Sequence, residues 1–396
     1  MTAASATVAL LSAPGPTLAD HLATHGPLPP GDAIAVAEEA GLTGRGGGGF
    51  PTAVKLRSVA GGRRAPVVVA NGSEGEPASA KDAVLLSRAP HLVLDGIALV
   101  AGTLGAASAV LAADAARLPE LAPHVAERRD RLPVRLHPVA AGYLAGEESA
   151  LVAALNGRAP VPTSKFPPVR ERGVDGRPTL VINVETLARL ALLARGDSSA
   201  GDRALLTRRL ERAGRLWVDV VDAPLSTPLA EWLPLDADVQ AVLIGGYAGT
   251  WVPARTAARL SLDHSGLAAA GARLGAGVLA ALPADRCGLR ETARVVHFLA
   301  GESAGQCGPC LNGLPRIAAA MDLLARPAPP PPDLLPAVRR WCGLLPGRGA
   351  CSHPDGTVRL VAGALGVFGP ELDRHRAGTC TARVHRAFLP VPRRPR

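Results

Sequence analysis

The stretch of this sequence best suited to chemistry is a glycine-rich loop, Gly41-Leu-Thr-Gly-Arg-Gly-Gly-Gly-Gly-Phe-Pro-Thr-Ala-Val-Lys55. Between Gly44 and Gly49 every residue except Arg45 is glycine. Backbone without Cβ atoms can turn its N–H groups toward an anion, and Arg45 and Lys55 add positive charge. The loop therefore predicts a phosphate-binding cradle. The alternative is a flexible glycine linker.

The loop matches neither of the common nucleotide-binding motifs. Gly44 to Gly49 fits the dinucleotide pattern G-x-G-x-x-G, but that pattern needs a strand immediately before it. The preceding residues, 32–39, are alanine-rich and amphipathic with Asp32 as N-cap, so they predict a helix. Lys55 follows a valine and not a glycine, which excludes a P-loop. We therefore expect a phosphate cradle of a third type.

Polar motifs follow two short apolar strands. Residues 66–71 predict a buried strand that ends in Asn71-Gly-Ser-Glu-Gly-Glu-Pro77, and residues 178–183 predict another that ends in Asn183-Val-Glu-Thr186. Ligands of open α/β sheets bind at the carboxyl ends of strands. Carboxylates near a phosphate cradle favour contacts with ribose hydroxyls or a carboxamide. A third acidic motif, Gly142 to Ser149, starts a helix, and its glutamates also suit the helix dipole.

Lysines and aromatic residues are scarce, and they share one region of the chain. Aromatic residues make up 3% of the sequence, and three of the 43 lysines and arginines are lysine. All three lysines, and all three aromatics before Trp217, lie before residue 170. This pairing favours stacking on a flat heterocycle that carries phosphates; the alternative is that they are ordinary surface residues. The lysines are Lys55, Lys81 and Lys165, and the aromatics are Phe50, Tyr143 and Phe166.

Composition excludes several classes of protein. The 396 residues are 47% hydrophobic, enough for several domains whose cores consist of Ala, Val and Leu. The net charge of +9 comes from scattered arginines without interleaved aromatics, which argues against nucleic-acid binding. No signal-peptide pattern opens the chain. Residues 96–113 are uncharged but rich in Ala and Gly, so we expect a buried helix–turn–strand and not a membrane span. These features predict a cytoplasmic protein.

The six cysteines do not form a disulfide framework, since no export signal is present. Cys287, Cys342 and Cys380 are isolated in sequence and are interpreted as small buried side chains. Cys307-Gly-Pro-Cys310 alone resembles a thiol–disulfide exchange pair. That reaction is typical of a βαβ context, whereas helices are expected on both sides here. Thiol exchange stays an alternative.

Taken together, these segments resemble the NADH-binding flavoprotein subunit of respiratory complex I and related subunits of NAD-linked hydrogenases and formate dehydrogenases. The resemblance runs in the family's order from about residue 33 to 380 and is carried by residues 44–55, 71–82, 142–149, 178–187 and 302–313. It implies FMN contacts at Arg45, Gly46, Gly47, Gly49, Lys55, Asn71, Glu74, Gly146, Glu147 and Asn183. It implies NADH contacts at Phe50, Glu76, Tyr143, Glu148 and Lys165.

The resemblance also implies an iron–sulfur cluster. The family's motif is C-x2-C-x2-C with a distant fourth cysteine, and Cys307, Cys310 and Cys351 match its last three positions, whereas Ala304 occupies the first. A three-iron (3Fe-4S) cluster, a four-iron (4Fe-4S) cluster with a different ligand on one iron, and no cluster all stay open. We expect an oxygen-labile cluster on the three cysteines. Candidate ligands for the remaining iron are water, Ser303 and His353.

The expected fold is α/β with three domains. After a loose N-terminal lead-in (1–31), these are an FMN- and NADH-binding α/β domain (32–210), a ubiquitin-like β-grasp domain (211–285) and a helical iron–sulfur domain (286–390). NADH would give a hydride to FMN, and single electrons would pass through the cluster to a ferredoxin-like or complex I-type partner subunit. No side chain need act as acid or base, because the flavin carries the chemistry. The alternatives are a non-catalytic assembly subunit and a CGPC thiol oxidoreductase.

Overall fold

A computed structural model describes residues 10–62, 64–163, 165–236 and 238–392. The described residues form two compact units. The first comprises residues up to 75, 80–205 and 222–224, and the second comprises 76–79, 206–221 and 225–392. Each unit is described by itself below.

The first unit is built on a parallel four-stranded sheet of order β3-β2-β1-β4. Val67 pairs with Ser108 on one side and with Thr179 on the other, so three strands start in register. β1 is buried along most of its length, as expected of a strand that is covered on both faces. The strands are β1 (Val67–Gly72), β2 (Ser108–Asp114), β3 (Val134–Val139) and β4 (Thr179–Asn183).

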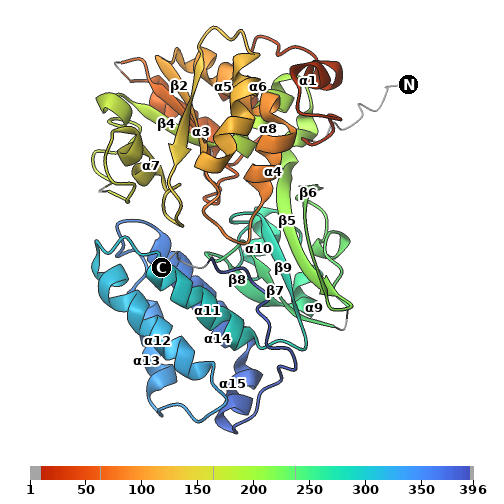
Figure 1. Cartoon of the computed structure of the whole chain (residues 1–396), viewed down its shortest axis with the longest axis vertical. Helices are drawn as coiled ribbons and strands as arrows, with labels where there is room; N and C mark the ends of the chain where they lie inside the picture. The colour runs from red at the N-terminus through yellow and green to blue at the C-terminus, as the bar shows by residue number, and fades with distance from the viewer. Residues whose placement is uncertain (1–9, 63, 164, 237, 393–396) are drawn as a thin grey trace. The chain divides into compact units, whose positions relative to one another are not determined.

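Helices pack on both faces of this sheet (Figure 1). Val67 and Val69 of β1 share one core with Leu151 and Val152 of α7 (Glu148–Leu155). Side chains alternate along a strand, so Val68 and Ala70 face the opposite side, where α5 (Pro90–Leu104) and α8 (Val184–Ala194) contact β1 and each other. The parallel sheet is therefore sandwiched, and its carboxyl edge is reached by the loops that follow β1 and β4.

The uncharged stretch 96–113 forms the end of α5, a turn and most of β2, which confirms the predicted helix–turn–strand. Most of α5 is buried within the first unit. Among the described residues no single helix is long and apolar enough to cross a membrane. Only α4 (Lys81–Arg88) and α5 together reach that length and composition, and they are bent by 93° relative to one another.

The N-terminal segment is not loose from residue 10 onward, so this part of the prediction was wrong. Thr17 caps α1 (Leu18–His25), and Leu10 is fully buried. His21 of α1 lies 2.8 Å from Asp95 of α5 through Nε2 and Oδ2, in the interior of the unit. Leu10 and the buried His21–Asp95 pair hold this N-terminal segment in place, although its Ala/Pro-rich composition alone predicts little order.

Helices flank the glycine loop, and the first of them lies where the sequence predicted it. α2 (Ala33–Glu39) begins at Asp32, whose side chain accepts from the N–H of Ile34 (2.8 Å). α3 (Thr52–Ala60) follows the loop. The absence of a strand before the loop, within the described residues, confirms that it is not a dinucleotide-binding turn. The remaining helices of this unit are η1 (Ala115–Arg117), α6 (Leu118–Ala126), η2 (Val174–Gly176) and η3 (Ser198–Asp202).

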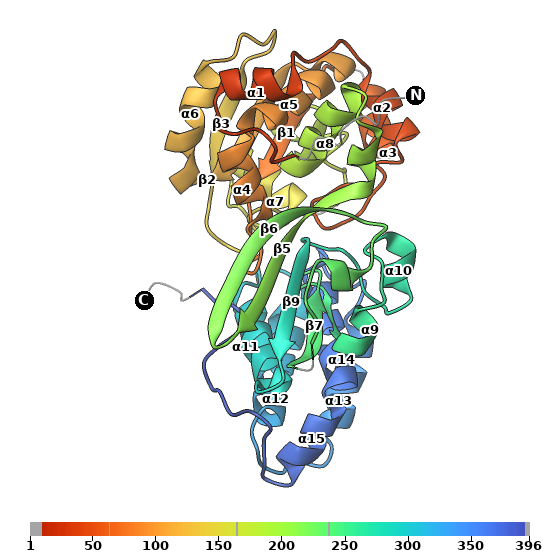
Figure 2. The same cartoon turned by 90° about the vertical axis from the view of Figure 1, so that its right-hand side faces the viewer.

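The second unit contains a mixed sheet of order β6-β5-β9-β7-β8 (Figure 2). Its central strands β5 and β9 are parallel, whereas β7 is antiparallel to both β9 and β8. Strands β6 to β9 lie within residues 211–285, where the sequence predicted a β-grasp domain, and β5 begins before that range. The strands are β5 (Arg203–Arg212), β6 (Arg215–Pro224), β7 (Val239–Ile244), β8 (Thr250–Pro253) and β9 (Val278–Pro283); short helices are η4 (Leu229–Glu231), α9 (Ala254–Ala257) and α10 (His264–Ala268).

Helices make up the rest of the second unit, as predicted. α11 packs against α12 and α14, and α13 contacts both α12 and α14. The helices are α11 (Gly288–Gly301), the π-helical turn η5 (Pro309–Gly313), α12 (Leu314–Leu324), α13 (Leu334–Leu344), α14 (His353–Val367) and α15 (Gly369–Arg376). The division of the chain into three functional domains stays a proposal, because the predicted β-grasp and helical domains fall largely within one compact unit.

Candidate functional site

The glycine loop is tied at its base and exposed at its tip. The N–H of Gly44 donates to the carbonyl of Phe50 (2.9 Å), and the N–H of Thr52 donates to the carbonyl of Leu42 (2.8 Å). Residues 46–49 between these bonds are exposed. Gly47 and Gly49 have φ angles of 100° and 61°, a backbone conformation that favours glycine. The exposed backbone of the tip fits an anion cradle.

The loop lies against the carboxyl end of β4. A Cβ atom on Gly46 would be 3.1 Å from Cβ of Asn183, so a larger residue would push the loop from the sheet edge. Arg45 anchors the loop on the other side. Its N–H donates to Oγ1 of Thr186 (2.9 Å), and its guanidinium donates to the carbonyls of Arg203 (3.1 Å) and Gly201 (2.7 Å).

The guanidinium of Arg45 anchors the loop to the protein, whereas the sequence had suggested that its charge faces a phosphate. Arg45 is only 5% exposed, and its guanidinium N–H groups donate hydrogen bonds to protein oxygens. Burial lowers its pKa below the usual value. The guanidinium and the backbone N–H of Arg45 both hold the loop against the protein, so the exposed residues 46–49, and not Arg45, offer backbone N–H groups to a phosphate.

Lys55 and Glu148 form an ion pair at the surface of the first unit. Lys55 Nζ lies 3.0 Å from Glu148 Oε1, and the two side chains are 35% and 44% exposed. They come from α3 and from the first residue of α7, so two of the predicted motifs meet here. The partly exposed ammonium can reach a ligand as well as Glu148.

Asn71 joins two loops at the carboxyl edge. Its Nδ2 donates to the carbonyl of Gly146 (2.8 Å), and its Oδ1 accepts from the N–H of Ser73 (3.1 Å). A Cβ atom on Gly146 would lie 2.9 Å from Oγ of Ser73, so the two loops are in close contact. The two FMN positions that the resemblance assigned to these loops, Asn71 and Gly146, are therefore adjacent.

Asn183 occupies the neighbouring position at the end of β4. Its Oδ1 accepts from the N–H of Glu185 (3.0 Å) as the N-cap of α8, and its Nδ2 donates to Oδ2 of Asp82 (2.7 Å). Glu74 and Glu147 also cap helices. Glu74 accepts from the N–H of Ala83 (3.0 Å) in α4, and Glu147 caps α7.

A buried charged cluster that the site prediction missed lies beneath this edge. Lys81 Nζ lies 2.6 Å from Asp82 Oδ1 and 3.1 Å from Glu185 Oε2, and Lys81 is only 3% exposed. Burial alone would lower the pKa of Lys81, but Asp82 and Glu185 raise it above its ordinary value. Burial raises the pKa of Asp82 to about 6, against the opposing effect of Lys81. The scarcity of lysine was the sequence signal that could have identified this group.

The aromatic residues assigned to NADH are accessible. Phe50 is 55% exposed, Tyr143 is half-buried, and Lys165 is exposed. Phe166, beside Lys165, is 85% exposed. Exposed rings of this kind can stack on a flat heterocycle.

Glu76 belongs to the second unit, unlike the other residues assigned to the two nucleotides. Its Oε2 accepts from the N–H of Tyr247 (2.7 Å) and its Oε1 from the N–H of Ala78 (3.1 Å). The carboxylate supports the turn between β7 and β8. Its contact with NADH stays a prediction.

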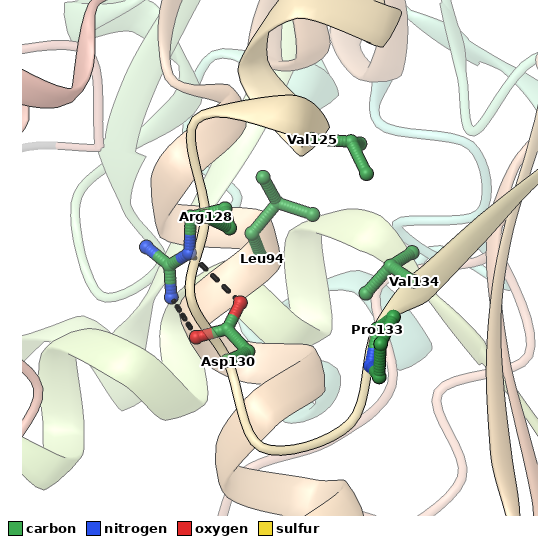
Figure 3. Close-up of a pocket in the computed structure, with 6 residues that line it drawn as sticks. All are labelled: Leu94, Val125, Arg128, Asp130, Pro133 and Val134. Carbon is green, nitrogen blue, oxygen red and sulfur yellow. Dashed lines mark hydrogen bonds and ion pairs between the residues drawn. The ribbon is translucent and has the colours of Figure 1, made fainter.

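A small pocket in the first unit lies elsewhere on that unit's surface. Leu94, Val125, Pro133 and Val134 line it with the Arg128–Asp130 ion pair (2.8 Å), as Figure 3 shows. Its lining includes none of the residues predicted to bind FMN or NADH.

Three cysteines of the second unit carry the cluster prediction. Burial raises the pKa of Cys310 to about 11, and the thiols of Cys307 and Cys351 lie close enough to add to this effect. Burial would also raise the pKa of Cys307, but the N–H groups of Ala350 and Cys310 lower it. The π-helical turn η5 places Cys310 inward, and Cys351 directly precedes α14. These sulfurs fit an iron–sulfur cluster with three thiolate ligands.

The fourth corner of such a cluster has no thiolate. Ala304 stands in the family's first cysteine position, and the neighbouring Ser303 side chain lies close enough to Cys310 to lower the pKa of its thiol, against the larger effect of burial. His353 is buried, and its Nε2 lies 2.8 Å from the carbonyl of Leu299. Of the two candidate side-chain ligands, Ser303 is thus the one near a cluster cysteine. Helices α11 and α12 flank the motif, as expected, in place of a βαβ unit.

Of the other cysteines, Cys287 is buried as predicted, whereas Cys380 is only partly buried. Cys287 and Cys380 lie together with Glu371 and His375. Cys342 of α13 is half-buried. The first two are distant in sequence, so no local pattern indicated that they meet.

Comparison with known proteins finds two matching regions. Residues 37–192 match the model of the Nuo51 FMN-binding domain, and residues 290–375 match that of the NADH-ubiquinone oxidoreductase-F iron–sulfur binding region. The two matched ranges contain the glycine loop and the three cysteines, respectively. In both regions the chain is therefore similar to NADH-binding flavoprotein subunits.

Relatives in this flavoprotein family match most of the chain. The F 2 subunit of NADH-quinone oxidoreductase of Rhizobium meliloti is 27% identical over 383 residues, covering 87% of this chain and 89% of the relative. The F subunit of NADH-quinone oxidoreductase of Salmonella typhimurium is 29% identical, covering 87% and 84%. The NAD+-reducing [NiFe]-hydrogenase in the H2-reduced state matches with a TM-score of 0.79 at 26% identity over 87% of this chain. This chain spans 62% of the length of that hydrogenase chain.

Proposed function

We propose that this chain is an NADH dehydrogenase module, which accepts a hydride from NADH on bound FMN and passes single electrons through an iron–sulfur cluster. The observation that carries the proposal is the presence of both sites on one chain. An exposed glycine loop lies against the carboxyl edge of a parallel sheet, and three cysteines converge in a helical region; each region matches the corresponding family model.

FMN would lie at the carboxyl edge of the first unit's sheet. The N–H groups of the exposed tip, Gly46 to Gly49, would bind its phosphate, with Lys55 supplying the charge. Asn71, Glu74, Gly146, Glu147 and Asn183 form the loops around it. Bound there, the flavin supplies the conversion between two-electron and one-electron transfer. The side chains hold and orient it; none is required to move a proton.

NADH would stack at the exposed side of this edge. Phe50 and Tyr143 offer rings, and Lys165 offers a cation for the phosphates. Glu148 would bind ribose hydroxyls or the carboxamide. A carboxylate near the adenosine ribose repels a 2′-phosphate, so NADH should be a better donor than NADPH.

Cys307, Cys310 and Cys351 would bind the cluster as thiolates. The electron acceptor would then be a ferredoxin-like or complex I-type subunit, since the relatives are named as parts of a quinone oxidoreductase and a hydrogenase. A cytoplasmic location, either free or at the periphery of a membrane complex, fits these expectations. The partner would supply any contact with a membrane.

The visible spectrum of the anaerobically purified chain tests the proposal. We expect flavin bands together with a broad iron–sulfur shoulder, both bleached by NADH and less readily by NADPH. A flavin spectrum that NADH does not bleach would instead support a non-catalytic assembly subunit. A colourless protein with two rapidly titrating thiols at Cys307 and Cys310 would support thiol exchange.

A further inference from the structure

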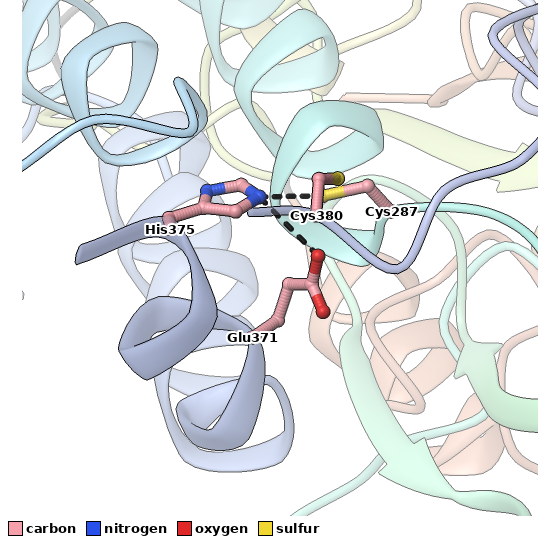
Figure 4. A group of neighbouring side chains, drawn as sticks. All are labelled: Cys287, Glu371, His375 and Cys380. Atoms are coloured by element: carbon pink, nitrogen blue, oxygen red, sulfur yellow. Dashed lines mark hydrogen bonds and ion pairs between the residues drawn. The ribbon is translucent and has the colours of Figure 1, made fainter. Parts of the chain in front are cut away.

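Four metal-ligand side chains converge in the second unit, away in sequence from the Cys307 motif. Cys287 stands at the N-cap of α11, Glu371 and His375 are one turn apart on α15, and Cys380 lies in the segment after α15. Figure 4 shows the four side chains pointing toward one another. Their ligand atoms all lie within 4.8 Å of one another, and three of the residues are buried.

The distances between these atoms fit tetrahedral coordination. Cys287 Sγ lies 3.6 Å from His375 Nε2, and His375 Nε2 lies 3.3 Å from Glu371 Oε1. Zinc bonds of about 2.3 Å to sulfur and about 2.0–2.1 Å to nitrogen or oxygen place tetrahedral sulfur–nitrogen pairs about 3.6 Å apart and nitrogen–oxygen pairs about 3.3 Å apart. Both distances therefore match a zinc site without rearrangement.

The histidine is held in the tautomer that binds a metal. His375 Nδ1 lies 2.9 Å from the carbonyl of Leu324 at the end of α12. A carbonyl can only accept a hydrogen bond, so Nδ1 carries the proton. The lone pair of the neutral ring then lies on Nε2, which faces the two cysteines and the glutamate. A backbone carbonyl on the far nitrogen is the usual support of a metal-bound histidine.

The other ligands are also oriented from outside the cluster. Thr381 donates to Glu371 twice, from its N–H (2.9 Å) and its Oγ1 (2.6 Å). Cys287 Sγ accepts from the N–H of Arg290 (3.4 Å) at the start of α11, which orients the sulfur.

We propose that Cys287, Glu371, His375 and Cys380 bind one structural Zn²⁺ ion. All four corners of the tetrahedron are taken by protein ligands, which is typical of a structural and not a catalytic zinc site. Two thiolates with imidazole and carboxylate favour zinc over the oxygen-preferring Mg²⁺ and Ca²⁺. This site is separate from the proposed FMN and iron–sulfur chemistry and does not depend on it.

The ion would hold the C-terminal segment of the second unit. Cys380 belongs to residues 377–392, which follow α15 as an extended strap. Farther along, the N–H groups of Phe388 and Leu389 donate to Glu291 of α11 (3.0 and 2.9 Å). The zinc would thus fix one end of the strap to the start of α11, and Glu291 would fix the other end to the same helix.

Metal analysis of the full-length chain tests this site. Zinc and iron are measured separately after purification in zinc-containing medium, and we expect about one zinc ion per chain in addition to any iron. X-ray absorption at the zinc edge should give two sulfur neighbours at about 2.3 Å and two lighter ones at about 2.0 Å. A centre with three or more sulfur neighbours would place the zinc on the Cys307 motif and overturn the proposal.

Matched variants separate the two cysteine sites. Cys380→Ser and His375→Gln should lose most of the zinc, whereas Cys351→Ser should keep it and lose iron. Cys342→Ser, on the half-buried α13 cysteine, is the control that should change neither metal. Zinc content that is unchanged in Cys380→Ser, or a Cys287–Cys380 disulfide in the protein purified under reducing conditions, would contradict the site. If a variant fails to fold, Co²⁺ bound to the unaltered chain gives the same answer through the visible bands of tetrahedral thiolate coordination.

Discussion

At the scale of single residues, Lys55 is the charge that the glycine loop presents to a ligand. Arg45 is buried and bound to protein oxygens, and Lys81 lies in a buried cluster. Lys55 remains partly exposed and pairs with Glu148 at 3.0 Å. The two partners of this pair are predicted to serve different nucleotides, so they can be tested independently.

Lys55→Ala should weaken FMN binding in a protein that stays folded. A charge-assisted hydrogen bond contributes about 1.5–3 kcal/mol, so the FMN dissociation constant should rise roughly tenfold to a hundredfold. Titration of the apoprotein with FMN measures this effect. Lys165→Ala, on an exposed lysine assigned to NADH, is the control and should keep the original FMN affinity. Unchanged FMN binding in Lys55→Ala would remove this residue from the cradle.

Glu148→Gln should impair the reaction with NADH and not the binding of FMN. The amide cannot match a carboxylate as acceptor for ribose hydroxyls, and kcat/KM for NADH should fall about tenfold, or ~1.4 kcal/mol. Flavin reduction by dithionite should proceed at its original rate. Stopped-flow reduction compares the two donors, and equal slowing with both would point to a damaged flavin site.

Ala304→Cys should complete the ligand set of the cluster. With a thiolate on the fourth corner, an oxygen-labile or three-iron centre should become a stable centre with about four irons per chain. Iron analysis and EPR after anaerobic reconstitution measure the change. Ser303→Ala in the parent chain tests whether the hydroxyl beside Cys310 had served as a ligand. If Ala304→Cys alters neither iron content nor EPR signal, position 304 does not face the cluster.

At the scale of elements, the close packing of α5 on α8 positions the sheet edge. A Cβ atom on Gly96 of α5 would lie 2.1 Å from the carbonyl oxygen of Leu187 in α8, closer than any real contact. The N-terminal end of α8 is capped by Asn183 and carries Glu185, which pairs with Lys81. The spacing between α5 and α8 therefore helps to position the polar side chains at the carboxyl edge of the sheet.

Gly96→Ala should destabilise the first unit by about 3 kcal/mol, because the added methyl group meets backbone that cannot move without separating the helices. Gly102→Ala is a matched control on the same helix, since its Cβ atom would have no neighbour within 4 Å. That substitution should be neutral or stabilising by up to about 1 kcal/mol. Urea unfolding of the two variants compares them, and equal stability would show that the helices relax.

At the scale of the whole molecule, acid should destabilise the fold through buried histidines of the first unit. Burial, aided by neighbouring positive charges, lowers the pKa of both His25 and His91 to about 4 from an ordinary 6.5. Below about pH 6.5 these histidines become protonated in the unfolded chain, whereas in the folded chain they stay neutral until about pH 4. Stability should therefore fall across this range as the pH falls. The charged and titratable groups around the two rings are His21, Asp95, His124, Glu127, Arg128 and Arg195.

The fully buried His91 should contribute up to about 3 kcal/mol of this loss, at ~1.4 kcal/mol for each pKa unit. Asp82 acts in the opposite direction, because burial raises its pKa to about 6 from 3.8 and favours the protonated folded state as the pH falls. The test is therefore a difference: His91→Phe should show a smaller loss of stability between about pH 7 and pH 4.5 than the parent chain. His297→Gln, on an exposed histidine, is the control. Parallel pH profiles for parent and His91→Phe would contradict the assignment.

The sequence by itself determined the elements and motifs on which the site depends. The apolar run of β1, the cap at Asp32 and the glycines from Gly46 to Gly49 act through local propensities and backbone freedom, so nearby residues were sufficient to predict them. The resemblance then ordered these motifs along the chain. The cysteine spacing likewise identified Cys307 and Cys310 as a pair.

Only the tertiary structure decided which side chains meet. It directs the guanidinium of Arg45 into the fold, buries Lys81 between two carboxylates, assigns Glu76 to the second unit, and brings Cys287 to Cys380. Each of these outcomes depends on contacts between residues far apart in sequence. Such contacts are set by how helices and strands pack, because burial of apolar surface fixes the elements and the polar groups must then find partners where packing leaves them.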